Sequence, residues 1–102
     1  MIHVVAVITA KPGKRGEILR HFRANVPAVK AEKGCIEYGP AVDAENAPGL
    51  QTKCGPDTFL VIEKWASMDA LKGHAAAPHM AAYAAKVKEM IASRTIHVLS
   101  PA

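Results

Sequence analysis

The chain has 102 residues, 50% hydrophobic and 5% aromatic, with a formal net charge of +4. This length suits one compact domain, residues 1–102, and the scattered basic residues, without interleaved aromatic side chains, disfavour nucleic-acid binding. No apolar run approaches the roughly 18 residues of a membrane helix, and the strand-like N-terminal residues lack the charged leader and small-residue cleavage site of a signal peptide, so we expect a cytoplasmic protein without membrane insertion.

The first part of the chain predicts a strand, a helix and a second strand. Residues 2–9 are β-branched and nearly all apolar, which is typical of a strand. Apolar side chains recur at spacings of three and four over residues 14–33, which predicts a helix kinked by Pro27 in its last turns. Gly34 suits a left-handed position after that helix, and residues 35–42 predict a weaker strand.

The remainder predicts a loop, two strands and two helical segments. Residues 43–57 carry several glycines and prolines, and an ordered loop of this length often has a function. Residues 58–65 predict a third strand, residues 69–74 a short helix capped by Ser67, residues 78–92 a helix begun by Pro78, and residues 94–100 a last strand. The order β-α-β-β-α-α-β is the split βαβ pattern of an α+β, ferredoxin-like antiparallel sheet.

Both sides of the first strand are apolar, whereas one face of an antiparallel sheet usually meets water. A monomer of this size lacks the mass to cover both faces, so we expect a homodimer, with a cavity beside the face that the partner covers. The two sides of the strand are Ile2, Val4, Ala6 and Ile8, and His3, Val5, Val7 and Thr9.

Glu63 shares one face of the third strand with Phe59 and Trp65. If that face is buried, the carboxylate must be paired or have a raised pKa. Glu63 is then either a structural residue in an ion pair or a carboxylate of a functional site. Trp65 can belong to the core, to a ligand wall, or to both.

His74 and His79 are five residues apart with Pro78 between them, which is poor geometry for a metal site, so no metal is expected. Each ring is either a half-buried, hydrogen-bonded residue at a helix start or a group that exchanges a proton or binds a ligand near neutral pH. The two cysteines, Cys35 and Cys54, lack a Cys-x-x-Cys spacing and are expected to be free thiols. No phosphate loop, Gly-x-Ser-x-Gly or Cys-x-x-Cys-His motif occurs, which removes the usual signals for nucleotide cofactors, serine chemistry and covalent haem.

Residues 26–43, 59–83 and 96–101 resemble the antibiotic biosynthesis monooxygenase (ABM) family, and within it the bacterial quinol monooxygenases. The resemblance is carried by Glu63, Trp65, Ser67, Ala70, Leu71, His74, Pro78, His79 and Tyr83, supported by Gly34, Cys35 and Tyr38. It implies a dimeric α/β-barrel and an enzyme that oxidises quinol-like phenols with O₂ and no cofactor. A deprotonated hydroquinone can itself pass an electron to O₂, so the protein needs only a pocket, a proton acceptor and orientation.

On this resemblance His79 or His74 accepts the phenolic proton and Glu63 orients or polarises the site. We expect His79 to face the cavity, with His74 positioning it or contacting the partner chain. Tyr38 is expected to hydrogen-bond the substrate. The apolar wall is expected to consist of Trp65, Phe59, Met80 and Tyr83.

Two other functions compete with this one. The haem-degrading branch of the same family uses an asparagine on the first strand and a histidine late in the last helix as iron ligand. This chain lacks both, which disfavours haem degradation. The corresponding residues are Val4, Val5 and Ala6, and Ala82, Tyr83, Ala84 and Ala85. A non-catalytic module that binds small aromatic metabolites or serves for dimerisation stays open, because one fold hosts many functions. Histidines held in structural hydrogen bonds would favour the binding module, and a free imidazole the enzyme.

Overall fold

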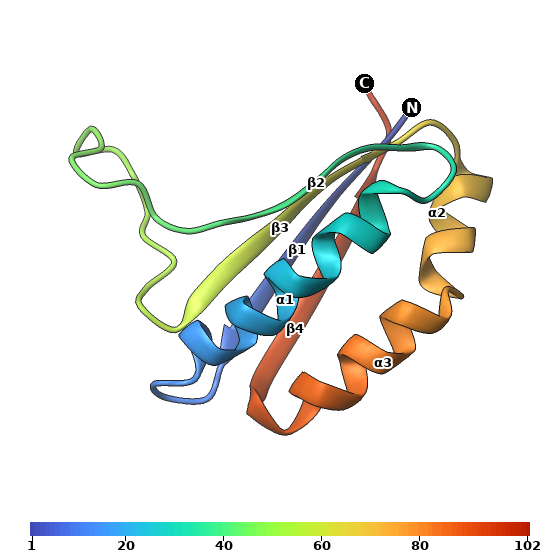
Figure 1. Ribbon diagram of the computed structural model, residues 1–102. Helices are drawn as coiled ribbons and strands as arrows, with labels where there is room; N and C mark the ends of the chain where they lie inside the picture. The colour runs from blue at the N-terminus through green and yellow to red at the C-terminus, as the bar shows by residue number, and fades with distance from the viewer.

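The computed structural model describes residues 1–102 as a four-stranded antiparallel sheet with three helices on one side (Figure 1). The sheet order is β2-β3-β1-β4, so the α+β ferredoxin-like expectation is confirmed. In chain order the elements are β1 (Ile2–Ala10), α1 (Arg15–Lys30), β2 (Cys35–Ala41), β3 (Thr58–Trp65), α2 (Met68–Ala75), α3 (Pro78–Val87), the 3₁₀ turn η1 (Lys88–Met90) and β4 (Ile91–Leu99).

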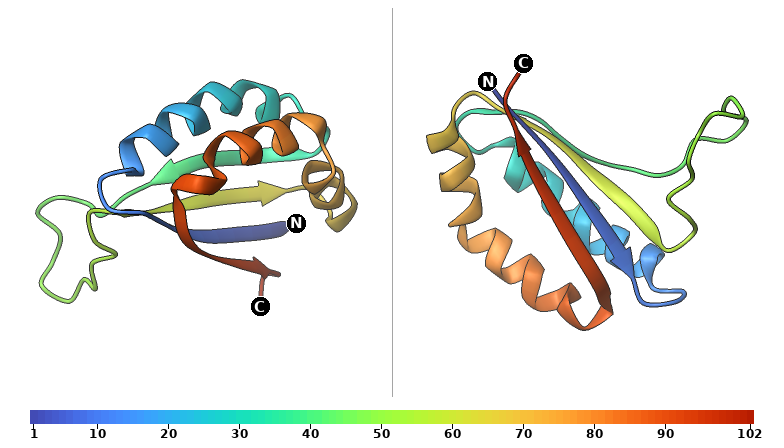
Figure 2. Two further views of the ribbon diagram at one scale, coloured as in Figure 1. Left: turned by 90° about the horizontal axis from the view of Figure 1, so that it is seen from below. Right: turned by 180° about the vertical axis from the view of Figure 1, so that it is seen from behind.

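All three helices cover the same face of the sheet, and the opposite face is bare (Figure 2). In β1 and β3, successive side chains alternate between the two faces, and the antiparallel partners Val4 and Glu63 lie on the helix side. The partners Val5 and Ile62 lie on the bare side and are only half-buried. The buried helix-side residues of the two central strands are Val4, Ala6, Ile8, Ala10, Phe59, Val61, Glu63 and Trp65.

Helix α1 runs through Pro27 and ends at Lys30 rather than at Lys33. The N–H of Ala31 still reaches the carbonyl of Pro27, at 3.1 Å, so the proline does not end the helix. Gly34 has φ +83°, the left-handed conformation that the sequence indicated, although a short turn separates it from the helix.

The predicted extension of the last helix to residue 92 was wrong. Helix α3 ends at Val87, η1 follows, and β4 begins at Ile91 rather than at residue 94. Pairing with β1 explains the difference: Ile91 pairs with Ala10, and the carbonyl of Met90 accepts the N–H of Lys11 at 2.8 Å. These contacts override the helical spacing of Met90 and Ile91, which is a weak local signal.

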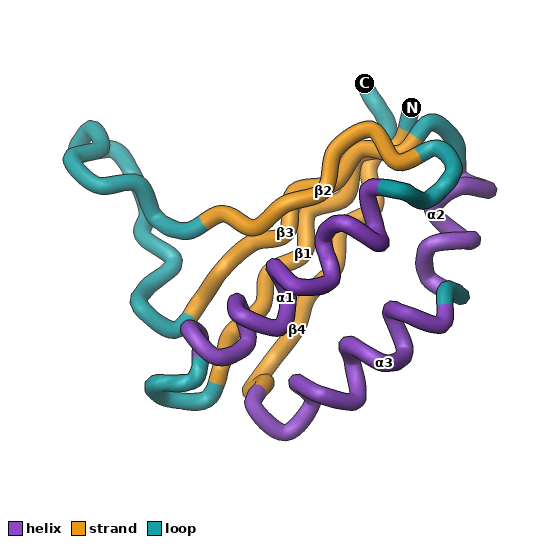
Figure 3. Tube along the Cα trace, in the orientation of Figure 1, coloured by secondary structure: helices purple, strands orange, loops and turns teal.

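The segment between β2 and β3 projects from the body as a long loop (Figure 3). Asp43 holds its base, because its two carboxylate oxygens accept the backbone N–H groups of Cys54 and Gly55, each at 2.9 Å. These hydrogen bonds lower the pKa of Asp43. Leu50 in this loop is 90% exposed.

Cys35 and Cys54 are both free thiols, as expected. None of the helices has the length and hydrophobicity needed to span a membrane.

Candidate active site

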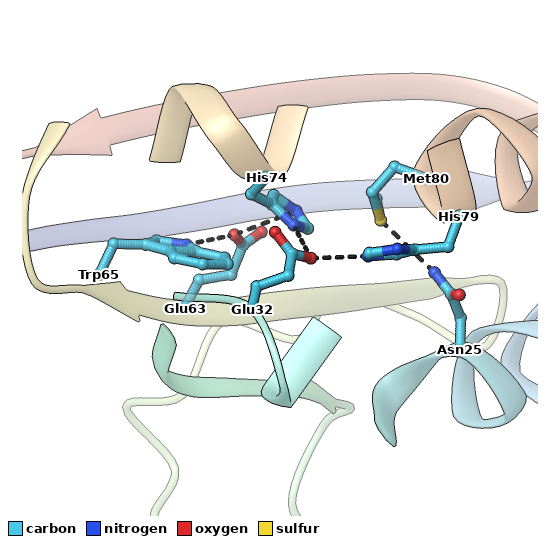
Figure 4. Close-up of polar contacts among 7 residues, drawn as sticks. All are labelled: Asn25, Glu32, Glu63, Trp65, His74, His79 and Met80. Carbon is cyan, nitrogen blue, oxygen red and sulfur yellow. Dashed lines mark hydrogen bonds and ion pairs between the residues drawn. The ribbon is translucent and has the colours of Figure 1, made fainter. Parts of the chain in front are cut away.

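Two carboxylates and two imidazoles meet between the helix side of the sheet and the helices (Figure 4). His74 Nδ1 and His79 Nε2 both hydrogen-bond the same oxygen, Oε2 of Glu32, at 2.9 and 2.7 Å. On its other side, His74 Nε2 lies 3.8 Å from Oε1 of Glu63. The two histidines that the sequence singled out are therefore joined through one glutamate, and one of them also faces Glu63.

Glu32 is the member of this cluster that sequence reasoning missed. It lies in the short turn after α1, where its N–H donates to the carbonyl of Val29 and its carbonyl accepts the N–H of Cys35. The surrounding segment, Lys-Ala-Glu-Lys-Gly, reads as the solvated end of a helix, yet the Glu32 side chain is only 12% exposed. Its partners are 42 and 47 residues away in sequence, so no local spacing connects them.

Glu63 projects from β3 into the core, and the predicted need for a partner is met by Trp65. The indole Nε1–H of Trp65 donates to Oε1 of Glu63 at 2.9 Å. Burial raises the pKa of Glu63, the Trp65 hydrogen bond and the neighbouring His74 oppose this, and the charge of Glu32 adds to it. The net direction is upward, so the carboxylate holds a proton more readily than an exposed glutamate.

Replacing Glu63 with glutamine should change how stability depends on pH. A raised folded-state pKa means that the folded protein binds the proton more tightly, so the stability that Glu63 contributes is fully present below pH 4.5 and is lost as pH rises through the folded-state value. The substituted amide stays neutral and keeps an oxygen for the Trp65 N–H. The unfolding free energy of Glu63→Gln minus that of the wild type, from urea titrations between pH 4 and 8, should therefore increase with pH and then level off. A difference that is constant or decreases with pH would contradict this.

Aromatic rings surround the cluster, and Phe22 of α1 is their centre. Its ring stacks on Tyr38 at a centroid distance of 5.1 Å and meets Phe59 and Tyr83 edge-on, each at 5.9 Å. The imidazole of His74 continues this group: its ring lies 4.6 Å from Trp65 and 5.4 Å from Tyr38. Sequence reasoning placed Phe22 only on the apolar stripe of the helix, where its spacing could not show that it contacts three of the proposed substrate-binding residues, Tyr38, Phe59 and Tyr83.

The two tyrosines of this group are expected to remain protonated. Burial is the largest cause in both cases: it raises the pKa of Tyr83 to about 12, and that of Tyr38 further, with help from Glu63. Both phenols are therefore hydrogen-bond donors near neutral pH.

The two histidines differ in accessibility. The His79 side chain is 30% exposed and that of His74 only 7%. Beside His79, the amide Nδ2 of Asn25 on α1 contacts Sδ of Met80 on α3 at 3.4 Å, so the two helices meet at this point (Figure 4). No group of three or more His, Cys, Asp or Glu side chains is arranged to hold a metal ion.

The predicted site residues lie on the helix-covered face, not beside the bare face where a cavity was expected. Phe59 and Trp65 are fully buried within the chain. Two hollows lie away from the two histidines: one of about 390 Å³ follows β2 and is lined by Tyr38, Glu37 and Ile62, and one of about 560 Å³ lies within the projecting loop. Access to the cluster is therefore from the side where His79 is partly exposed.

Gly34 fixes the approach of the Glu32 turn to the strand and helix that follow. A Cβ at Gly34 would lie 2.5 Å from Cβ of Ala70, and the carbonyl of Gly34 accepts the N–H of Ala66 at 2.8 Å. With φ at +83°, Gly34→Ala adds backbone strain to this clash, and we expect a loss of about 2–4 kcal/mol in unfolding free energy. The measurement is urea denaturation at fixed protein concentration.

A matched control is Gly16→Ala, because Gly16 lies in α1 and an added Cβ there meets nothing within 4 Å. This change should be neutral or slightly stabilising, since alanine is the better helix former. Equal effects of the two substitutions would show that the Gly34 contact does not constrain the fold.

Comparison with known proteins gives the class. The model of the family described as "Antibiotic biosynthesis monooxygenase" matches residues 1–86. The "Probable quinol monooxygenase YgiN" of Escherichia coli K12 is 37% identical over 103 residues, which cover 99% of this chain and 98% of that protein. The chain belongs to the antibiotic biosynthesis monooxygenase family, as the sequence resemblance indicated.

Solved structures agree with the fold. The crystal structure of PA3566 from Pseudomonas aeruginosa is 26% identical with a TM-score of 0.80, covering 99% of this chain and 93% of that one. A conserved protein from Methanosarcina mazei Go1 is 24% identical with a TM-score of 0.83, covering 99% and 92%, a likeness of fold alone.

Proposed function

We propose that this protein is a cofactor-independent monooxygenase or oxidase that acts on a quinol or related phenol with O₂. The observation that carries the proposal is the partly exposed imidazole of His79, which is held by Glu32 through Nε2 and forms no hydrogen bond within the chain through Nδ1. Membership in a monooxygenase family and the name of the Escherichia coli relative support the reaction class.

In this proposal His79 accepts the phenolic proton. The quinolate that results is a much better electron donor than the neutral quinol and can reduce O₂ directly. His74 and Glu63 are positioning groups behind His79, because both are buried and His74 contacts Glu32 and the Trp65 ring. Tyr38 and Tyr83, kept protonated by burial, can donate hydrogen bonds to the oxygen that loses its proton.

Substrate contacts are expected to begin with the half-buried side chains near His79, which include Met80, Tyr83 and Asn25. Phe59 and Trp65 form the rear of the apolar wall, since neither has exposed surface. A planar quinol ring therefore has to part the side chains between α1 and α3 before it can stack against the deeper rings.

A non-catalytic role in binding aromatic metabolites is the second candidate, and one observation favours it. His74 is engaged by Glu32, lies against Trp65, and is almost fully buried, as a purely structural histidine would be. His79, by contrast, is held by Glu32 through only one of its two ring nitrogens. The two candidates therefore differ in whether Nδ1 of His79 exchanges a proton with the ligand.

Oxygen uptake by metal-stripped protein with a panel of naphthohydroquinones tests the function. We expect saturable uptake above the spontaneous oxidation rate, and ¹⁸O₂ then separates the two chemistries: label in the organic product indicates oxygen insertion, whereas labelled hydrogen peroxide indicates oxidation. Uptake equal to background, with the quinols bound as judged by calorimetry, would instead establish the binding module.

We also propose that the bare face of the sheet is covered by a second copy of the chain in a homodimer. Its centre is formed by the half-buried apolar residues Val5, Val7, Leu60 and Ile62 of the two central strands. A lysine in place of Val7 would bury a charge in such an interface, so Val7→Lys should give monomers in sedimentation velocity at concentrations where the wild type is dimeric. The control is Ala85→Lys on the exposed side of α3. A wild type that sediments as a monomer would refute the dimer.

A further inference from the structure

The position of Glu32 between the two histidines restricts where their protons lie. An ionised carboxylate has no hydrogen to donate, so each imidazole nitrogen that contacts Oε2 of Glu32 must carry a proton to form a hydrogen bond. The contacts are with Nδ1 of His74 at 2.9 Å and Nε2 of His79 at 2.7 Å. A protonated Glu32 could donate to one ring and accept from the other, so the tautomers derived below are those that the ionised carboxylate fixes.

The two histidines are therefore held in opposite tautomers. A neutral imidazole has one N–H, so His74 carries its proton on Nδ1 and His79 carries its proton on Nε2. The unprotonated nitrogen of His74 is Nε2, which points toward Glu63 at 3.8 Å inside the core. The unprotonated nitrogen of His79 is Nδ1, which has no partner in the chain and belongs to the more exposed ring.

We propose that Glu32 is a positioning residue that fixes both tautomers and so makes Nδ1 of His79 the atom that accepts the substrate's proton. This inference rests on the proposed function for the identity of the proton donor. In the step, the O–H bond of the phenol breaks, an N–H bond forms at Nδ1, and the substrate is left as an oxyanion. The imidazolium that forms lies 2.7 Å from the Glu32 carboxylate, which stabilises its charge.

The same arrangement stops the proton at His79. Both N–H groups point at Oε2 of Glu32. A proton passed from His79 to this oxygen could not move on to His74, because Nδ1 of His74 already carries a proton and has no free lone pair. Transfer onward would require His74 to change tautomer within a ring packed against Trp65 at 4.6 Å. His74 therefore keeps Glu32 in place, and only His79 exchanges protons with the substrate.

The first test needs no substrate. Two-bond ¹H–¹⁵N spectra of histidine-labelled protein distinguish Nδ1–H from Nε2–H imidazoles, and comparison with His74→Gln and His79→Gln assigns the two signals among the five histidines. We expect Nδ1–H for His74 and Nε2–H for His79, and loss of both preferences in Glu32→Gln, whose side chain has lost its charge and can donate as well as accept. Nδ1–H at His79 in the wild type would overturn the inference.

The second test is kinetic. Glu32→Gln should lower kcat for quinol oxidation by about 10²–10⁴-fold with a much smaller change in KM, whereas Glu89→Gln, an exposed glutamate in η1, should leave both unchanged. Full kcat in Glu32→Gln with an active wild type would refute the inference while the proposed function stands. If the wild type shows the expected tautomers but oxidises no quinol, the proposed function fails and the role of Glu32 in fixing the histidines is upheld.

Discussion

Replacing His79 with alanine should lower the catalysed rate of quinol oxidation by about 10²–10⁴-fold, the usual contribution of a positioned proton acceptor. The loss should fall mainly on kcat, because the imidazole takes the proton in the transition state and contributes little of the apolar contact that binds the ring. Fold stability should change little, since the side chain is 30% exposed and contacts Glu32 alone among polar groups.

The measurement is oxygen uptake at several quinol concentrations, with the spontaneous rate subtracted. His21→Ala is the matched control, because His21 lies on α1 and its ring contacts Arg20 at the surface. Added imidazole should partly restore the rate of His79→Ala, since the small base can enter the space that the side chain leaves. Unchanged kcat in His79→Ala would exclude this residue as the base and return the assignment to His74.

Truncating Phe22 to alanine should lower the free energy of unfolding by about 3–5 kcal/mol. Phe22 is 2% exposed and its ring contacts Tyr38, Phe59 and Tyr83. Removing the ring therefore creates a cavity and eliminates three aromatic contacts. Because α1, β2, β3 and α3 meet at this ring, the surrounding structure has few ways to collapse into the space.

Urea denaturation at one fixed protein concentration measures this effect. Phe22→Leu keeps most of the volume and should lose less than about 1.5 kcal/mol, and Leu50→Ala, at a residue that is 90% exposed, should change stability by less than about 0.5 kcal/mol. If Phe22→Ala were no more destabilising than Phe22→Leu, the aromatic group would not be the structural centre of the fold.

The sequence predicted the four strands and three α-helices of this protein, because β1, β3 and β4 are rich in β-branched residues, α1 and α3 carry apolar stripes, and Ser67 caps α2. The clearest error, at residues 88–93, came from reading Met90 and Ile91 as the next turn of α3. Local spacing cannot reveal that Ile91 pairs with Ala10, a contact between residues at opposite ends of the chain.

The candidate site was predictable only in part. His74, His79, Glu63 and Trp65 stand out because polar or amphipathic side chains interrupt apolar segments, and the structure brings them into one connected group. Glu32 gave no such signal, since a glutamate between lysines is typical of a solvated surface. Its burial depends on the packing of its turn against Ala66, which follows β3, and Ala70 of α2, and this close approach depends on Gly34 rather than on any property of Glu32 itself.

The two edges of the sheet differ in how they can meet another strand. Edge strand β2 contains Pro40, which has no N–H to donate to an added strand. Proline is one of the residues that protect sheet edges from such pairing in natural proteins. Edge strand β4 spans nine residues without proline or glycine, and its Ile96 and Val98 are about half exposed. Edge-to-edge growth is thus open on one side only: two sheets joined β4 to β4 would present a blocked β2 at each end, so strand pairing could not continue into a fibre.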